Sequence, residues 1–248
     1  NSKAIREKAV GKEHPDYAWC LNNLAMLYYN MGNYEKAEPL YLEAKTIREK
    51  ALGKEHPDYA ASLNNLAVLY YNMGNYEKVE LLYLEAKDIW GKTLGKEHPN
   101  YAWSLNNLAN LYLTMGNHEK AEPLYLEAKS IREKALGKEH PDYATSLENL
   151  STLYHKMGNY EKAEQLSLEV RSILEKALGK EHPDYAWCLT GLAILYMNMG
   201  NYEKAEPLYV EAKTIFEKAL GKEHPDYATS LNNLAILYMN MGNYEKAE

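Results

Sequence analysis

Apolar residues along this chain recur at spacings of three and four within two kinds of segment that alternate from end to end. The first kind, in its earliest complete copy from about Pro15 to Met31, has the apolar positions Tyr17, Leu21, Leu24, Tyr28 and Met31. The second kind, from about Tyr34 to Leu52, has Ala37, Leu40, Tyr41, Ala44, Ile47 and Ala51. Because residues three and four apart share one face of an α-helix, both segments are predicted to be amphipathic helices.

Helix-breaking residues separate these segments at a fixed interval. One glycine precedes Lys-Glu-His and another lies within Met-Gly-Asn, and each returns every 42 residues, six times in all. The two sets are Gly11, Gly53, Gly95, Gly137, Gly179 and Gly221, and Gly32, Gly74, Gly116, Gly158, Gly200 and Gly242. Pro15 suits the first position of a helix, and Asn33 is a good N-cap. Gly32 and Gly53 are typical helix stops, so each interval holds one pair of helices and two turns.

The predicted fold is all-α, an α-solenoid of about six 42-residue helix-turn-helix repeats that occupies residues 1–248 as a single array. One helix pair cannot bury its own apolar face, whereas stacked pairs bury a continuous core. Asn1 aligns with Glu43, and Glu248 aligns with Glu38. The chain is therefore expected to start and end inside second helices, as a fragment of a longer array.

The repeat also resembles that of a known family. The order Leu21, Leu24, Ala25, Tyr28, Gly32, Tyr34, Ala37, Tyr41, Ala44 resembles the tetratricopeptide repeat (TPR). That repeat usually has about 34 residues, and the stretches LNNLA, NYEKAEPLY and GKEHPDYA look like its 42-residue subclass, found in kinesin light chains and many bacterial arrays. The resemblance implies a superhelix whose first helices line a concave groove. In the family this groove usually binds peptides or partner proteins.

A helical wheel of the first helix, at about 100° per residue, separates a buried side from a groove side. The groove side carries Trp19, Asn22, Asn23, Met26, Tyr29 and Asn30, and the buried side carries Leu21, Leu24, Ala25, Leu27, Tyr28 and Met31. Among the six copies the positions of Trp19, Met26 and Tyr29 vary, while the leucine positions and exposed charges such as Lys36 and Glu38 do not. Two explanations are open: a recognition surface, or drift at tolerant positions with inter-repeat ion pairs that hold the charges constant.

Asparagines are the most distinctive residues of the groove side. Their amides donate and accept hydrogen bonds, which suits the backbone of an extended peptide, although Asn23 and its equivalents could instead bond to a neighbouring helix. Trp19 and Trp103 flank the small Ala61, either as walls of an apolar socket or as covers for adjacent helices. The predicted peptide-binding groove consists of Trp19, Asn22, Asn23, Met26, Tyr29, Ala61, Asn64, Asn65, Tyr71, Trp103, Asn106 and Asn107.

Composition excludes several other classes of protein. The net charge is −7 with no basic stripe, which argues against a nucleic-acid partner. No apolar run reaches about 18 residues, so no membrane partner is expected. The first residues lack the apolar core of a signal peptide. Cys20 and Cys188 are the only cysteines and have no zinc-ligand spacing, so a cytoplasmic location is expected.

The histidines do not form a catalytic or metal-binding pattern. Six of the eight lie in His-Pro loops a full repeat apart, too far to converge within about 2–2.2 Å of one metal ion. His155 is a lone residue of the groove side. No nucleophile–base pair and no phosphate-binding loop is present, so the chain is predicted not to be an enzyme and to need no cofactor.

The expected function is a protein–protein interaction scaffold. The varying groove positions carry only two charges, Glu148 and Lys156, so a neutral or apolar extended segment is the expected partner. The first three repeats are the favoured site, because Glu148, Thr190 and Gly191 interrupt the asparagines later on.

The alternative is a structural spacer with no groove ligand that associates head to tail through uncapped ends. In this alternative, the N-terminal half-helix of one copy of the chain completes the C-terminal half-helix of another and covers Leu231, Leu234 and Tyr238.

Overall fold

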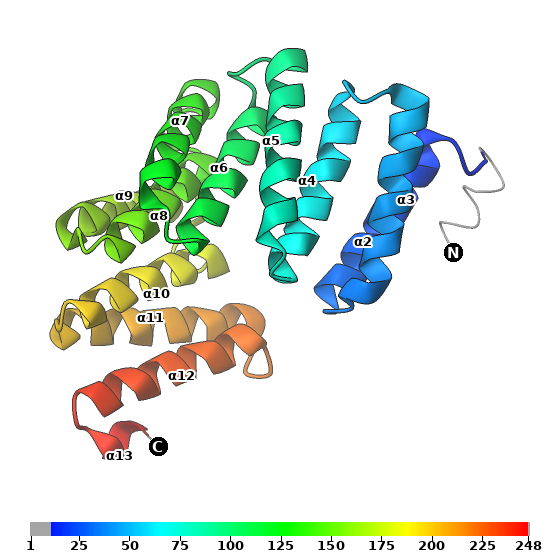
Figure 1. Ribbon diagram of the computed structural model, residues 1–248. Coiled ribbons are helices and arrows are strands. Elements are labelled where there is room, and N and C mark those ends of the chain that lie inside the picture. Colours follow the sequence, from blue (N-terminus) through cyan, green and yellow to red (C-terminus); the bar gives the residue numbers. More distant parts are fainter. Residues whose placement is uncertain (1–10, 248) are drawn as a thin grey trace. The chain divides into compact units, whose positions relative to one another are not determined.

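The computed structural model describes residues 11–247, and the regular secondary structure in this range is entirely α-helical (Figure 1). First helices of the repeats are α2 (Pro15–Asn30), α4 (Pro57–Asn72), α6 (Pro99–Thr114), α8 (Pro141–Lys156), α10 (Pro183–Asn198) and α12 (Pro225–Asn240). Second helices are α3 (Tyr34–Leu52), α5 (Tyr76–Thr93), α7 (His118–Leu136), α9 (Tyr160–Leu178), α11 (Tyr202–Leu220) and the short α13 (Tyr244–Ala247). This regular succession of helix pairs confirms the predicted all-α solenoid.

The chain divides into two compact units, Asn1–Ile131 and Arg132–Glu248, with the boundary inside α7. In the first unit, α2 packs on α3 and α4 on α5, and each second helix also packs on the first helix that follows it. The second unit repeats this arrangement with α8 on α9, α10 on α11, and α12 on α11. Within each unit, therefore, every first helix after the earliest lies between two second helices.

Each first helix begins at a histidine that caps it. His14 has an extended backbone with φ −80° and ψ 140°, as expected for a residue before proline. Its Nδ1 accepts a hydrogen bond from the backbone N–H of Asp16 at 3.1 Å. Because the same cap forms at all six His-Pro sites, the histidines have a structural role here. At the other turn, Gly32 has φ +71° and Asn33 accepts from the N–H of Lys36 at 3.2 Å.

The buried core follows the predicted apolar faces with three corrections. Met31 is 68% exposed, because it follows the last residue of α2 and its side chain has left the packed face. Leu27 is 54% exposed, whereas Leu69, its equivalent in the next repeat, is fully buried where α4 packs on the preceding second helix. On the second helix Ala51 is exposed, and Arg48 is buried instead.

The C-terminal repeat is better covered than the head-to-tail alternative expects. Leu234 is buried, and the hydroxyl of Tyr238 donates to Glu206 of α11 at 2.9 Å. The described part of the partner helix of this repeat, α13, has four residues, and the cover of Leu234 and Tyr238 comes from α11, which packs against α12. Leu231 is 42% exposed, as expected. The N-terminal half-helix of that prediction falls on residues 1–10, which lie outside the described range.

Buried arginines join consecutive repeats at two places. Arg48 donates from Nη1 to the Ser62 hydroxyl at 2.8 Å and to the Asp58 carbonyl at 3.1 Å. Arg132 makes the same two bonds to Ser146, at 2.9 Å, and to the carbonyl of Asp142, at 3.1 Å. One later repeat has Leu174 and Cys188 at the equivalent positions, both buried. The arginine–serine pair and the leucine–cysteine pair are thus alternative ways to fill the same junction.

The equivalence of the two pairs can be tested by replacing the arginine–serine pair of the first unit with the leucine–cysteine pair. Arg48→Leu should lower the free energy of unfolding by about 1–3 kcal/mol, because the buried hydrogen bonds of the guanidinium are lost. Adding Ser62→Cys should recover part of that loss, since a thiol tolerates apolar surroundings better than a hydroxyl. Urea denaturation followed by circular dichroism measures both effects. A double variant no more stable than Arg48→Leu would contradict the proposed equivalence.

Candidate functional site

The groove side of the first helices in the first unit combines exposed aromatic and apolar groups with partly buried amides. Trp19 and Met26 are about half exposed, and Trp103 is 38% exposed. Intermediate exposure is found at Asn22, Asn23, Tyr29, Ala61, Asn65, Tyr71 and Asn107. Asn64 and Asn106 are buried, with 0% and 3% exposure. The expectation that these two asparagines face an open groove is therefore wrong, because the close approach of adjacent first helices covers them.

The asparagines bond to one another across neighbouring repeats. Asn65 donates from Nδ2 to Oδ1 of Asn22 at 2.8 Å, and Asn107 donates in the same way to Asn64 at 2.9 Å. Each bond links residues 43 positions apart, so it joins one first helix to the next. For Asn65 and Asn107 the alternative of bonding to a neighbouring helix is thus confirmed. We call these bonds the rungs of an asparagine ladder.

A second row of bonds runs between the C-terminal ends of the same helices. Asn72 donates from Nδ2 to the Tyr29 hydroxyl at 2.8 Å. The hydroxyls of Tyr71 and Thr114 are 2.5 Å apart, again at a separation of 43 residues. Both rows hold adjacent first helices at a constant spacing, which preorganises the surface between them.

A pocket of about 320 Å³ opens on this surface between α4 and α6. It is lined by Val68, Tyr71, Asn72, Tyr83, Asn107, Asn110, Leu113 and Thr114. We call it the central pocket. Its walls combine apolar side chains with amides and hydroxyls, a mixture typical of ligand sites of this size.

The central pocket brings together only part of the predicted site. Tyr71 and Asn107 line it, whereas the other ten predicted residues do not. Sequence reasoning missed Tyr83, which α5 contributes from the second-helix position of Tyr41. Val68 and Leu113 were also left out of the predicted set, although their positions are among those that vary between repeats. That variation was the signal that pointed to them.

The tryptophans do not line the central pocket. The Trp103 ring lies 5.9 Å, centroid to centroid, from the buried ring of Trp90, which belongs to α5. Ala61 packs against a core cluster that includes Tyr59, Leu63 and Trp90. For Trp103 the structure thus bears out the alternative in which the ring covers a neighbouring helix.

The constant charges have structural partners in the next repeat. Tyr70 donates to Glu38 at 2.7 Å, and Tyr196 donates to Glu164 at 2.6 Å. Burial, followed by the bond to Glu38, raises the pKa of Tyr70 to about 12. A lysine ammonium lies over the tyrosine ring in each of these junctions, with Lys78 4.6 Å from the centroid of Tyr70. These contacts favour the explanation in which inter-repeat pairing keeps Lys36, Glu38 and their equivalents constant.

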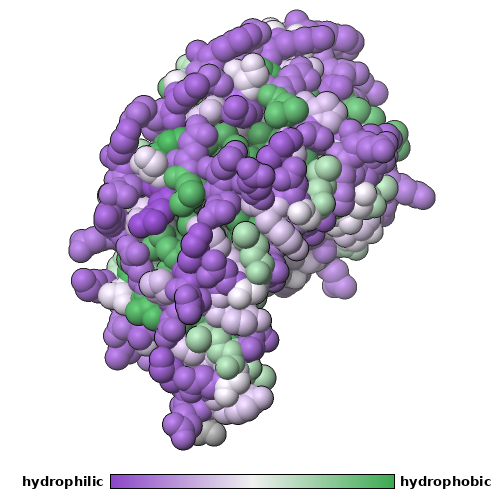
Figure 2. Space-filling model, turned by 90° about the vertical axis from the view of Figure 1, so that its left-hand side faces the viewer, coloured by the Kyte–Doolittle hydropathy of each residue, from purple (hydrophilic) through white to green (hydrophobic). Residues whose placement is uncertain are grey.

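Other chemistry is not apparent in residues 11–247. Among them, no group of three or more His, Cys, Asp or Glu side chains is placed to hold a metal ion. No helix in that range has the length and apolar character needed to cross a bilayer. The face drawn in Figure 2 is mostly hydrophilic, with hydrophobic side chains in small separate patches.

Comparison with known proteins agrees with this geometry. The tetratricopeptide repeat family model matches residues 1–50, 21–90, 72–134, 107–176, 152–197 and 191–248. Among solved structures, BtubC (BKLC) from P. vanneervenii is similar with 28% identity and a TM-score of 0.71, covering 85% of this chain and 84% of its own. A kinesin light chain-like protein of Podosopora anserina with nearly identical TPR-like repeats has 30% identity and a TM-score of 0.70, covering 83% of this chain and 97% of its own. No curated protein matches the chain significantly.

Proposed function

The chain belongs to the tetratricopeptide repeat family, and on that basis we propose that it is a scaffold that binds an extended peptide segment along its first helices. Repeats of this family are generally protein–protein interaction modules. The partner segment is neutral or mainly apolar where it meets the first unit. The role is non-catalytic, and a cytoplasmic location remains part of the proposal.

The observation that carries this proposal is the central pocket. Val68 and Leu113 offer apolar contacts, while the hydroxyl and amide groups of Tyr71, Asn72 and Asn107 surround them. A volume of about 320 Å³ is enough for one or two side chains of a bound segment. The rows of bonds between α4 and α6 fix the walls before binding, which reduces the entropy lost on association.

The central pocket can be tested with a charge placed at its wall. Val68→Lys should reduce the affinity for peptides selected on the wild-type protein by about tenfold or more, because it introduces a charge into an apolar contact. Position 68 is partly exposed, and its equivalents Met26, Asn110, Thr152 and Ile194 are chemically diverse, so the fold should tolerate the change. Fluorescence anisotropy with peptides from a random displayed library measures the affinity.

The matched control is Met26→Lys, at the equivalent position one repeat earlier. Met26 is exposed and does not line the central pocket, so this variant should bind the selected peptides as the wild type does. Equal losses in both variants would show a general charge effect. Failure of the wild-type protein to select any peptide would favour the alternative of a structural spacer.

A further inference from the structure

The asparagine ladder is broken in the second unit in an unusual way. Glu148 occupies the acceptor position of Asn22 and Asn64, and Gly191, 43 residues further on, occupies the donor position of Asn65 and Asn107. The rung between α8 and α10 thus keeps an acceptor, now as a carboxylate, and has lost its donor. Gly191 lies in a helix with nothing within 4 Å of where a Cβ would be, so the place of the missing amide is open.

The replacement also changes the exposure of the acceptor. Asn64 and Thr190, at equivalent positions, are buried, whereas Glu148 is exposed on the groove side. The hydroxyl of Thr152 donates to the backbone carbonyl of Glu148 at 3.0 Å, a bond that does not engage the Glu148 carboxylate. Neighbouring side chains partly desolvate this carboxyl group although the residue is exposed, and that desolvation, followed by the negative charge of Asp184, raises the pKa of Glu148. Arg171 is directed elsewhere, with Nε donating to the Tyr185 hydroxyl at 3.1 Å.

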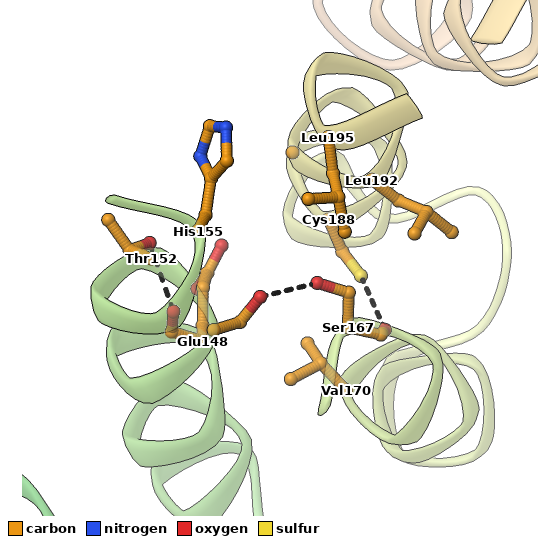
Figure 3. A pocket seen from close by; sticks show the side chains of 10 residues that line it. Glu148, Thr152, His155, Ser167, Val170, Cys188, Leu192 and Leu195 are labelled. Carbon is orange, nitrogen blue, oxygen red and sulfur yellow. Dashed lines mark hydrogen bonds between the residues drawn. The ribbon is translucent and has the colours of Figure 1, made fainter. Parts of the chain in front are cut away.

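A small cavity lies beside this carboxylate because two neighbouring positions have smaller side chains than their equivalents in the other repeats. Ser167 stands where four other second helices have tyrosine, namely Tyr41, Tyr83, Tyr125 and Tyr209, and Gly191 stands where asparagine is usual. The space that remains is about 70 Å³. Figure 3 shows the lining residues Glu148, Thr152 and His155 on α8, with Ser167 of α9 and Cys188 of α10 on the opposite side of the pocket. The hydroxyl groups of Ser167 and Ser151 are hydrogen-bonded to each other at 2.7 Å, and both lie in the wall of this cavity.

A second pocket of about 140 Å³ adjoins the first and shares Glu148 and Val170 with it. Its other lining includes the carboxylate of Asp184 and the indole of Trp187. The Trp187 ring is fixed by an edge contact with Phe216 at 5.2 Å and is still 38% exposed. Two carboxylates beside an aromatic face and apolar Val170 are the environment that a cation on an aliphatic stem prefers.

We propose that the paired pockets around Glu148 bind a basic side chain, lysine or arginine, of an extended partner segment. The cationic N–H groups replace the amide donor that Gly191 lacks and complete the rung to Glu148, while the aliphatic stem lies against Trp187 and Val170. The volume of about 140 Å³ is close to that of a cavity that holds one benzene molecule, so it fits one such stem. This subsite deepens the proposed function and rests on it: a partner that is apolar at the first unit is basic at the second.

The subsite can be tested with a free probe that requires no knowledge of the partner. n-Butylammonium, which has the shape of a lysine side chain, should give saturable shifts in the amide NMR signals of Gly191 and Trp187. The neutral isostere n-butanol should bind at least about tenfold more weakly, because a hydrogen bond between charged groups is lost. Equal binding of the two probes, or no saturable shift with either, would overturn the proposal.

Two variants test whether n-butylammonium binds at the broken rung. Glu148→Gln removes the charge and keeps the shape, and it should abolish the preference for n-butylammonium over n-butanol. Gly191→Asn restores the rung and should both raise the Tm and exclude the probe, because the new amide occupies the place of the ligand. A folded Gly191→Asn protein that binds n-butylammonium as tightly as the wild type would contradict the assignment.

Peptide selection separates this inference from the proposed function. Peptides selected by the wild-type protein should be enriched in lysine or arginine at one position. That enrichment should be lost in Glu148→Gln and kept in Val68→Lys. If n-butylammonium binds and no peptide is selected, the cation subsite stands and the scaffold function fails. If peptides are selected without any basic preference, the scaffold function stands and the subsite fails.

Discussion

Replacing Tyr125 by serine should lower the free energy of unfolding of the first unit by about 3–5 kcal/mol, the usual range for removing a buried aromatic ring. Tyr125 is fully buried in α7, and its hydroxyl donates to the amide oxygen of Asn110. The variant would leave both a cavity and an unpaired acceptor. Urea denaturation followed by circular dichroism is the direct measurement. A loss below about 1 kcal/mol would show that the core closes around the gap.

The second unit supplies the control for this experiment. Ser167 is the natural serine at the position equivalent to Tyr125, and Ser151 bonds to it where the first unit has Ala109. Adding Ala109→Ser to Tyr125→Ser should recover about 0.5–1.5 kcal/mol, the value of one restored hydrogen bond. The part of the loss in unfolding free energy that comes from the cavity should remain. Full recovery would mean that the hydroxyl pair, rather than ring packing, determines stability at this position.

Alkaline pH should unfold the protein cooperatively between about pH 10 and pH 12, through its buried tyrosines. Burial is the main cause that raises the pKa to about 12 at Tyr41, Tyr59, Tyr70, Tyr112, Tyr143, Tyr196 and Tyr209. In the unfolded chain the phenol titrates near pH 10. The folded state therefore holds its protons longer, and stability present below pH 10 is lost as the pH rises towards 12.

The test follows tyrosinate absorbance and helical circular dichroism in one pH titration. Both signals should change together, because the buried phenols ionise when the helices open. Tyr70→Phe should shift the transition to higher pH, since it removes one group that drives unfolding. Tyr244→Phe is the matched control, because that side chain is 67% exposed, and it should leave the midpoint unchanged. Ionisation of most tyrosines while the helices stay intact would contradict the prediction.

The central pocket and the ladder show how far the repeat pattern predicts a site. The pattern indicated the groove side and the positions that vary on it, and two of the predicted residues, Tyr71 and Asn107, line the central pocket. It also proposed Asn64 and Asn106 as open groups, and both are buried. The helical wheel of an isolated helix cannot show this error, because a neighbouring helix covers some residues of the groove side and leaves others exposed.

The sequence by itself determined the helices and their order. Glycine, proline and asparagine at 42-residue intervals set the boundaries, since they act through local backbone conformation and local hydrogen bonds. The spacing of the leucines and tyrosines set the packed faces, since helical geometry is the same wherever a helix lies.

Only the tertiary structure decided which polar groups pair across repeats and where space remains. Residues 43 positions apart become hydrogen-bond partners because of how adjacent helices are offset. The exchange of tyrosine for Ser167 opens a cavity only because the neighbouring helices, held by their other contacts, do not close on it. Pairing and cavities depend on the distance between elements, and that distance is set by every side chain in the interface together.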